Sequence, residues 1–145
     1  MVDEKEIKEL IEALAIKGRE GLKASKQLAS IGPPALPLLL DALTDRKDDH
    51  FRQLVALTLG RLGTPAIPPL INLLDHEDPG VRKHAVDALG ALQDDRRALQ
   101  AILKARKDPE EEVRAAAWRA LEHIPPHEPR FPRKALTGRR RDPLA

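Results

Sequence analysis

The chain has 145 residues, with 25 lysines and arginines against 23 acidic residues, a formal net charge of +2 and no cysteine. Its length is that of a single domain, and the lack of cysteine excludes disulfides and thiolate metal sites. No apolar run approaches the roughly 20 residues that cross a bilayer, so we expect no membrane span. The apolar residues are mainly Leu, Ala, Ile and Val, which favours helices over strands.

The first predicted unit covers residues 3–31. An apolar stripe with helical spacing predicts its first helix over residues 3–14: Ile7, Leu10, Ile11 and Leu14. Gly18 and Gly21 bracket a turn, and residues 22–31 are predicted to form the partner helix. This unit lacks the motifs that the later units share, which is typical of a terminal repeat with one side facing water.

The second and third units open with the same pattern, 31 residues apart. A glycine ends the preceding helix and prolines follow it: Gly32, Pro33, Pro34 and Pro37, and then Gly63, Pro65, Pro68 and Pro69. Glycine is common just after a helix, and proline is tolerated in a first helical turn. We therefore expect a helix to begin at each site, with the deeper prolines tightening its first turn.

A second motif occurs three times and sets the repeat period near 31 residues. Each copy has an aspartate and then an apolar–arginine pair: Asp48 with Phe51-Arg52, Asp78 with Val81-Arg82, and Asp108 with Val113-Arg114. The apolar–arginine pairs are 30 and 32 residues apart. A period of this size indicates a stack of helical units, each of which buries its apolar face against its neighbours.

The fourth unit begins with a charged helix near residues 94–105, and the periodicity stops after Ile124. We predict a repeat domain over residues 1–124 and a Pro-rich basic C-terminal tail over residues 125–145. The four repeats are predicted at residues 3–31, 32–62, 63–92 and 93–124. The tail is strongly basic, because residues 130–145 contain six Lys and Arg against one Asp.

From residue 31 to residue 124 the sequence resembles the HEAT-repeat family, in particular its short repeats of the phycobiliprotein-lyase type. The best match runs from Asp78-Pro79-Gly80-Val81-Arg82 to Ala88-Leu89-Gly90. The copy that begins at Asp108-Pro109 differs by a two-residue insertion and by Glu122 in place of the glycine. The resemblance implies an all-α fold, a short α-solenoid of about four antiparallel helix pairs in a HEAT-like superhelix.

The repeated aspartates and arginines are expected to hold the repeats together. An aspartate at the end of a turn can cap the next helix, and an arginine one turn further on can donate hydrogen bonds to that turn or to the next repeat. In the family such residues form a ladder. The resemblance implies this structural role for Asp48, Arg52, Asp78, Arg82, Asp108 and Arg114. The alternative is a row of arginines that binds an anion.

The sequence contains no nucleophile elbow, phosphate loop, dinucleotide motif or zinc-ligand spacing. We therefore expect a non-enzymatic scaffold or adaptor, without a cofactor, that binds another protein on the concave face of the solenoid. Helical phase opposite the apolar stripe gives the candidate residues of that face: Gln53, Lys83, Asp87, Ala115 and Arg119. One alternative is an auxiliary subunit of an enzyme, similar to a bilin lyase subunit, that holds the substrate protein.

Trp118 has the repeat position of Ala56 and Val86, on the flank where a further repeat would stack. Two interpretations stay open. In one, Trp118 covers the end of the stack together with Phe131 of the tail. In the other, Trp118 is a docking anchor for a partner protein, a role in which tryptophan is common.

The five histidines are not expected to bind a metal. HEAT-type di-iron hydroxylases place His-Glu pairs early in their second helices, where this chain has His84-Ala85 and Ala116-Ala117. His123 and His127 are separated by two prolines, which break the helical spacing that would bring them together. We expect solvated histidines instead.

The basic tail suggests a second kind of partner. Arg139, Arg140 and Arg141 concentrate positive charge, so the tail is either solvated or bound to a polyanion such as nucleic acid. The polar N-terminus has no apolar segment typical of a secretory signal, and we expect a cytoplasmic location. No feature of the sequence sets an oligomeric state.

Overall fold

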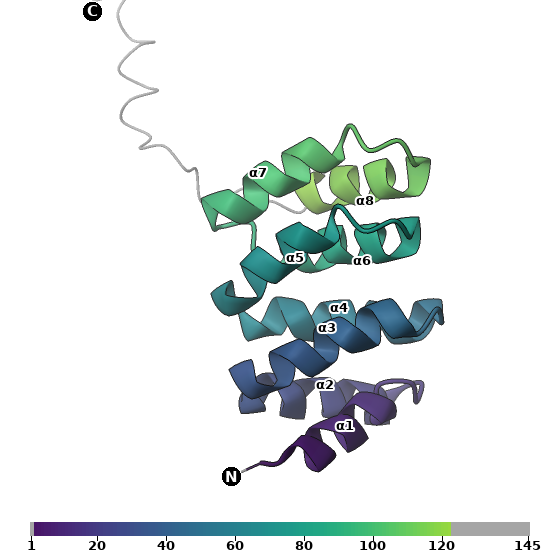
Figure 1. Cartoon of the computed structure of the whole chain (residues 1–145), viewed down its shortest axis with the longest axis vertical. Coiled ribbons are helices and arrows are strands. Elements are labelled where there is room, and N and C mark those ends of the chain that lie inside the picture. The colour runs from purple at the N-terminus through teal and green to yellow at the C-terminus, as the bar shows by residue number, and fades with distance from the viewer. Residues whose placement is uncertain (1, 123–145) are drawn as a thin grey trace, which may run out of the picture.

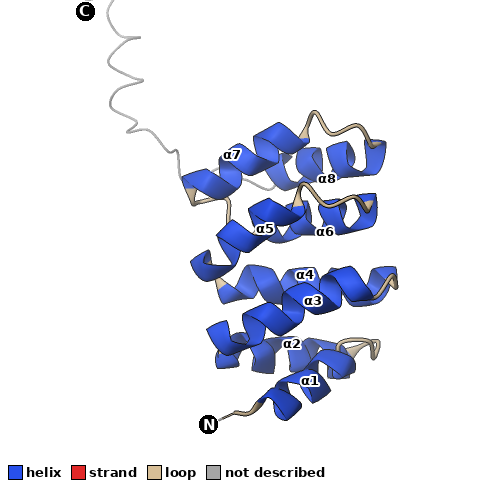
Figure 2. Ribbon diagram, in the orientation of Figure 1, coloured by secondary structure: helices blue, strands red, loops and turns tan. Residues whose placement is uncertain are grey.

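The computed structural model of the chain describes residues 2–122. Within this range it contains eight α-helices and two short 3-10 helices, and no strand. The α-helices are α1 (Glu4–Ala13), α2 (Arg19–Ile31), α3 (Leu36–Asp45), α4 (Asp49–Leu62), α5 (Ile67–Leu73), α6 (Pro79–Gly90), α7 (Arg96–Ala105) and α8 (Glu111–Glu122). Figure 2 shows that this part of the chain is all-α, as the sequence predicts. The predicted tail, with Phe131 and the three final arginines, lies outside the described residues.

The helices form four consecutive pairs stacked in two layers (Figure 1). The first helices of the pairs, α1, α3, α5 and α7, form one layer, and α2, α4, α6 and α8 form the other. In the second layer each helix packs against the next, so that α4 contacts α2 and α6, and α6 contacts α4 and α8. The arrangement is the α-solenoid that the repeat period predicts. None of the helices in residues 2–122 is both long enough and apolar enough to cross a membrane.

Aspartate side chains decide where several helices begin. Asp3 accepts a hydrogen bond from the Glu6 backbone N–H at 2.9 Å, so α1 begins at Glu4. Asp95 accepts one from Arg97 N–H at 2.9 Å, which places the start of α7 two residues later than the sequence predicts. The helix α2 starts three residues earlier than predicted, because Gly18, at φ 87°, serves as its N-cap.

The Gly-Pro openings of the second and third units fold as tight turns. Gly32 and Gly63 have φ angles of 81° and 85°, in the left-handed region that glycine adopts without strain. Short 3-10 helices, η1 (Pro33–Ala35) and η2 (Thr64–Ala66), follow them and lead directly into α3 and α5. The sequence predicts helix starts here but not the separate 3-10 turns, which suit proline because they need few backbone N–H donors.

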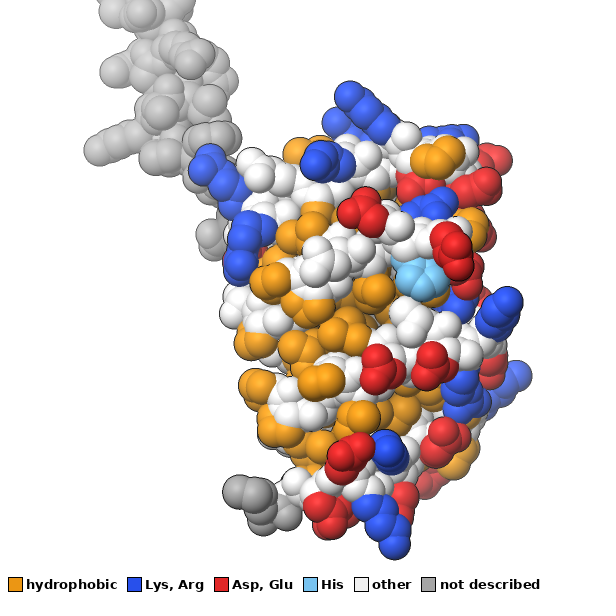
Figure 3. Space-filling view, in the orientation of Figure 1, with side chains coloured by type: hydrophobic (Ala, Val, Ile, Leu, Met, Phe, Trp, Pro, Cys, Tyr) orange, Lys and Arg blue, Asp and Glu red, His pale blue; other side chains and the backbone are white. Residues whose placement is uncertain are grey.

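A single apolar core runs through all four helix pairs. Its largest fully buried side chains come from every pair: Leu14, Leu28, Leu39, Leu43, Phe51, Leu59, Ile67, Leu70, Leu89 and Ile102. Further apolar side chains lie half-buried over the first-helix layer and are visible as an orange band in Figure 3. Because each pair is completed by its neighbours, the core is continuous, as expected for a repeat stack.

Glycine lets the second helices approach each other closely. A Cβ atom added to Gly60 of α4 would lie 2.9 Å from Ala91 Cβ, and one added to Gly90 of α6 would lie 3.1 Å from Ala120 Cβ. A larger side chain at either site would therefore push the next helix away. In the last unit Glu122 has the repeat position of these glycines, and its side chain is exposed.

Candidate functional site

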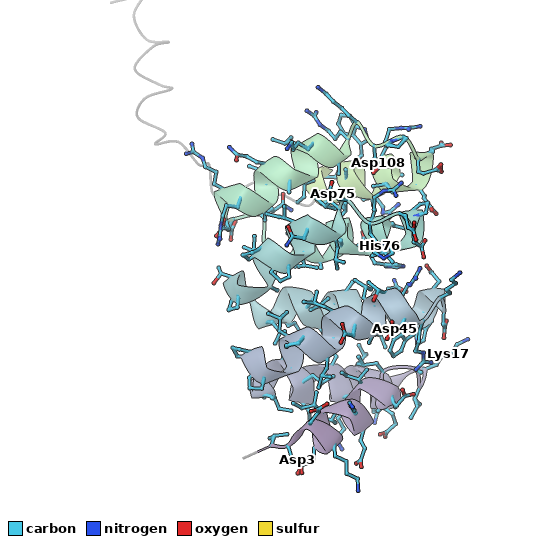
Figure 4. All side chains as sticks on the ribbon, in the orientation of Figure 1. Asp3, Lys17, Asp45, Asp75, His76 and Asp108 are labelled. Carbon is cyan, nitrogen blue, oxygen red and sulfur yellow. The ribbon has the colours of Figure 1, made fainter. Side chains whose placement is uncertain are left out.

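The turns inside the four helix pairs lie along one edge of the stack. Figure 4 shows this edge through labelled residues of those turns or their margins: Lys17, Asp45, His76 and Asp108. Each turn leads into a second helix, so the N-terminal ends of α2, α4, α6 and α8 all lie at this edge. Because the motif occurs once in each of the last three helix pairs, its charged residues all lie along this edge.

Two arginines join consecutive turns along this edge. Arg52 of α4 donates from Nη2 to Asp78 Oδ2 at 3.0 Å. Arg82 of α6 donates from Nε and Nη2 to Asp108 Oδ2 and Oδ1 at 2.9 and 3.2 Å. In both cases the arginine belongs to one unit and the aspartate to the next. These contacts link the second unit to the third and the third to the fourth.

The same arginines also bind backbone carbonyls of their own unit. Arg52 Nε donates to Leu43 O at 3.0 Å, and Arg82 Nη1 donates to His76 O and Glu77 O at 2.7 and 3.2 Å. The bonds to the carbonyls therefore hold each arginine side chain in the orientation in which it contacts its aspartate. Such pre-organised forks make strong charge-assisted hydrogen bonds.

Asp78 shows the electrostatic effect of these contacts. Burial acts to raise the pKa of the Asp78 carboxyl, but hydrogen bonds from Arg52 and from the Gly80 backbone N–H outweigh it. The pKa of Asp78 is therefore held below its ordinary value. The carboxylate also caps α6, because it accepts the Gly80 N–H at 2.8 Å.

The first and second units are not joined by an arginine–aspartate pair of this kind. Asp48 accepts the His50 N–H at 3.1 Å and caps α4, and within residues 2–122 no arginine reaches its carboxylate. At the repeat position of Arg52, 31 residues earlier, the chain has the buried Gly21. A different pair, Arg46 Nη1 to Glu12 Oε1 at 3.0 Å, ties the first and second units together.

A second set of charged residues crosses α4, α6 and α8 and is named here the polar row: Asp49, Lys83, His84, Asp87 and Arg119. His84 Nε2 lies 3.0 Å from Asp49 Oδ1, and His84 Nδ1 lies 3.6 Å from Asp87 Oδ2. Lys83 Nζ lies 3.7 Å from Asp49 Oδ1, and Arg119 Nη2 lies 3.8 Å from Asp87 Oδ1. The polar row thus joins three successive second helices.

Three of the five residues predicted for the concave face lie in the polar row, namely Lys83, Asp87 and Arg119. Gln53 is exposed on α4, and Ala115 is half-buried on α8. A hollow next to the row lies between α6 and α8, and its lining residues are Asp87, Gly90, Ala91, Arg119 and Ala120. The second helices therefore present both charge and a depression on one surface.

The expectation of solvated histidines is wrong for His84, whose side chain is only 3% exposed. His84 has the repeat position of Leu54 and Ala116, which are both buried, so its ring faces into the stack. The spacing of three and four residues from Val81 and Ala88 is the signal that could have shown this. Neither His84 nor its partner Asp49 was among the predicted site residues.

The position of His84 beside Asp49 changes the pKa of the Asp49 carboxyl group. The hydrogen bond with His84 is the largest influence on its carboxyl group, followed by burial, which acts in the opposite direction, and by the charge of Lys83. Together they hold the pKa of Asp49 below its ordinary value. Asp49 is mostly exposed, so its carboxylate is accessible at the surface while the imidazole behind it is not.

Trp118 is 53% exposed on α8, and the Arg106 guanidinium lies 5.3 Å from the centroid of its ring. At the same repeat position, Ala56 and Val86 are buried, with exposures of 2% and 0%. The difference arises because α6 and α8 cover these two positions, whereas within the described residues no helix follows α8. The two interpretations of Trp118 remain predictions.

The donor set does not fit a di-iron centre of the kind that places His-Glu pairs on successive second helices. Among residues 2–122, no three His, Cys, Asp or Glu side chains are grouped so as to hold a metal ion. His84 is followed by Ala85, so α6 lacks the glutamate of a His-Glu pair, and the two ring nitrogens of His84 face Asp49 and Asp87. The equivalent residue on α8 is Ala116, which has no donor atom.

A family model of HEAT repeats matches residues 7–75, 36–122 and 67–142 in overlapping segments. The chain belongs to the HEAT-repeat family. The overlap of the three matches reflects the repeat period, because each model spans more than one helix pair. The HEAT fold therefore extends across the stack that the structure describes.

Named relatives of this HEAT chain include enzymes. Deoxyhypusine hydroxylase of Neurospora crassa is 36% identical over 95 residues, which is 62% of this chain and 29% of the fungal protein. The solved structure of human deoxyhypusine hydroxylase in complex with glycerol has a TM-score of 0.56 and 31% identity, over 83% of this chain and 44% of the human one. The chain thus spans less than half the length of these hydroxylases.

A second solved structure matches over a larger share of its own length. The complex of CpcE and CpcF of phycocyanin lyase from Nostoc sp. PCC7120 has a TM-score of 0.56 and 27% identity, over 85% of this chain and 82% of that chain. The similarity to a phycobiliprotein lyase is therefore confirmed at the level of the fold.

These similarities correct the expectation of a non-enzymatic scaffold. The related hydroxylases are enzymes, and they are built from the same repeats. The inference from a repeat stack to a mere binding surface was wrong, because a fold does not determine whether its surface carries chemistry. The absence of familiar catalytic motifs was equally weak evidence, since those motifs belong to other folds.

Proposed function

We propose that the chain is the protein-binding part of an enzyme that modifies another protein. Its HEAT repeats are similar to those of deoxyhypusine hydroxylase and phycocyanin lyase, and the second of these is named for a protein on which it acts. The match covers 82% of the phycocyanin lyase chain, so the similarity extends over most of that protein. The polar row would receive the protein to be modified.

The geometry of the polar row carries this proposal. The Lys83–Asp49 pair, at 3.7 Å, is a loose ion pair with a mostly exposed carboxylate. Exposed pairs of this kind contribute little to stability, so their partners can be exchanged for groups on another protein at small cost. Asp87 lies at the adjacent hollow between α6 and α8, which gives a neighbouring side chain a place to enter.

The residues that perform the chemistry would lie outside this surface. His84 cannot join a His-Glu metal site, because Ala85 and Ala116 supply no ligands. The same His84 suits a supporting role, since its ring holds Asp49 from behind and leaves the carboxylate exposed. The polar row is thereby rigid at its base and charged at its surface, which favours binding with little reorganisation.

The test is the covalent state of the bound protein. Proteins that co-purify with the full chain are first identified. Each of them is then isolated from cells with and without the gene for the chain, and the two intact masses are compared. We expect one of them to lose a defined mass when the gene is deleted. Wild-type chain should restore that mass, and a variant with Asp87→Lys and Lys83→Glu should not.

The matched control combines Asp41→Lys with Lys5→Glu, which makes the same pair of changes at exposed positions of α3 and α1 in the other helix layer. This variant should restore the mass as well as the wild type does. Unchanged masses after deletion would refute the enzymatic role. Full restoration by the Asp87 variant would refute the polar row as the binding surface.

We also propose that this reaction takes place in the cytoplasm. The sequence contains no cysteine, so the stability of the stack does not depend on disulfides and is unaffected by a reducing compartment. Cell fractionation with an antibody to the chain tests the location. Recovery with an extracytoplasmic fraction would contradict it.

A further inference from the structure

Arg114 of α8 is anchored to its own turn in the same way as Arg82 of α6. Arg114 Nη1 donates to Asp108 O and Pro109 O at 2.7 and 2.9 Å, which are the carbonyls six and five residues earlier. Arg82 Nη1 makes the same two bonds, to the carbonyls of His76 and Glu77. The two arginines therefore present the rest of the guanidinium in the same direction relative to their own helix.

What differs is the other edge of the guanidinium. In Arg82, Nε and Nη2 hold both oxygens of Asp108 in the next unit. In Arg114, Nε and Nη2 have no carboxylate partner among residues 2–122. Three glutamates precede Arg114, at residues 110–112, yet none of them forms an ion pair with it. Arg114, the arginine of the third copy of the repeated motif, is thus set to receive a carboxylate that residues 2–122 do not supply.

Trp118 lies one helical turn beyond Arg114 on the same side of α8. Its repeat equivalents Ala56 and Val86 are buried by the following helix, whereas Trp118 is about half exposed. Tryptophan and arginine are both enriched among the residues that dominate binding at the centres of protein interfaces. The repeat positions that are buried between units in α4 and α6 are therefore exposed in α8, the last of the described helices.

We propose that this surface, named the α8 end and comprising Arg106, Arg114 and Trp118, docks a different protein that presents an Asp or Glu at the start of a helix. The proposal is independent of the polar row, which lies on another side of α8. The partner carboxylate would bind Nε and Nη2 of Arg114, as Asp108 binds Arg82. Trp118 and Arg106 would cover the adjoining apolar side of the partner helix.

A second copy of the chain does not fit this surface. In head-to-tail stacking, the first unit would have to supply the aspartate. At the repeat position of Asp48, 31 residues earlier, the chain has Lys17, followed by Gly18 and Arg19. Two cations would then face the Arg114 fork, which is unfavourable. Residues 123–145 fit no better, because they contain six lysines and arginines against two acidic residues, Glu128 and Asp142.

Glu122 limits how the partner can lie. Gly60 and Gly90 allow α6 and α8 to approach within 2.9 and 3.1 Å of an added Cβ, but the equivalent residue of α8 is a glutamate. A partner helix therefore cannot pack closely along the whole of α8. Contact is confined to the part of α8 before Glu122, where Arg114 and Trp118 lie.

The experiment uses the full chain with a photo-crosslinking amino acid at Glu111, an exposed position three residues before Arg114 on the same side of α8. The protein is expressed in its native cells, irradiated, and its crosslinks are mapped by mass spectrometry. We expect a crosslink to a different protein, next to an Asp or Glu at a helix start. Arg114→Gln and Trp118→Ala should each reduce its yield at least tenfold.

A charge exchange identifies the contact. Replacing the partner carboxylate with arginine should abolish the crosslink, and Arg114→Asp should restore it. Trp118 is 53% exposed, so Trp118→Ala should leave the circular dichroism of the chain unchanged, and a loss of yield with an unchanged spectrum reports the contact itself. Asp41→Lys, a charge reversal at an exposed position of α3 in the other helix layer, should leave the yield unchanged.

Three results would overturn the proposal: crosslinks to residues 123–145 of the same chain, crosslinks to a second copy, or no crosslink at all. A yield that does not depend on Arg114 would do the same.

Discussion

Arg82 and Asp108 are 26 residues apart in the sequence and meet through two parallel hydrogen bonds of 2.9 and 3.2 Å. Their side chains are only 11% and 10% exposed, so the pair lies largely out of water between the third and fourth units. Arg52 and Asp78 are joined across the same separation of 26 residues. The contact is therefore a property of the repeat, and its consequences for stability can be tested.

We expect Arg82→Met to be strongly destabilising, because it leaves the largely buried Asp108 carboxylate with the Glu110 N–H as its remaining donor and removes the arginine donor of two carbonyls. Removing one partner of a buried ion pair costs about 3–5 kcal/mol of unfolding free energy, and urea unfolding would measure it. Lys8→Gln is the control, since the Lys8–Glu4 pair is exposed and should contribute too little to resolve. Equal effects of the two substitutions would show that the Arg82 pair is not structural.

Gly60→Ala is expected to reduce stability by about 1–2 kcal/mol, because its new Cβ would lie 2.9 Å from Ala91 Cβ. In an isolated helix the same change would be favourable by about 1 kcal/mol. Ala91→Gly removes the opposing Cβ, so Gly60→Ala should cost less in that background. A double-mutant cycle by urea unfolding measures this coupling, and an absence of coupling would contradict the close approach of α4 and α6.

The free energy of unfolding should decrease as the pH is lowered through the range in which Asp78 titrates. Its folded pKa lies below the ordinary 3.8. The unfolded state therefore binds a proton first as pH falls, and the stabilisation that is present above about pH 4 is lost below it, as the pH passes through the folded value. Asp78→Asn should flatten the dependence of the unfolding free energy on pH in this range. A profile with the same slope in both proteins would contradict the assignment.

His84→Leu should fold normally and raise the pKa of Asp49 towards its ordinary 3.8, because the hydrogen bond with His84 is the largest cause of its lowering. Leu54 already has the equivalent position, so the site can hold a leucine. Carboxyl-detected NMR titration of Asp49 measures the shift. Lys83→Gln is the comparison, and it should move the pKa of Asp49 less.

The regular part of the fold could be predicted from spacing alone. Gly63 and Pro65 mark a unit boundary, and Asp78 marks a helix start, because each acts through its own backbone or its nearest neighbours. The partner of Arg82 could not be predicted, since the sequence indicates that aspartates and arginines join the repeats but not which aspartate each arginine contacts. Burial of His84 was missed because its chemistry suggested solvent, whereas its position within the apolar period places it inside.

Function was less predictable than fold for a physical reason. The apolar period that builds α4, α6 and α8 is compatible with almost any set of surface residues between its buried positions. Binding or catalysis depends on those residues, and they do not alter the period. Asp87 and Arg119 look like ordinary solvated charges in the sequence, and only the stacking of α6 and α8 brings them within 3.8 Å of each other.

The first and second units lack the arginine–aspartate pair that joins the later units, and this has a consequence for how the molecule unfolds. The first helix pair is held to the second by the Arg46–Glu12 pair and by the buried Ser25–Thr58 hydrogen bond of 2.8 Å, in addition to apolar packing. In a linear array each unit is stabilised mainly by the unit next to it, so a weaker junction can open while the others stay closed. Amide protons of α1 and α2 should accordingly exchange with solvent faster than those of α6, through a partly open state that retains the other three helix pairs.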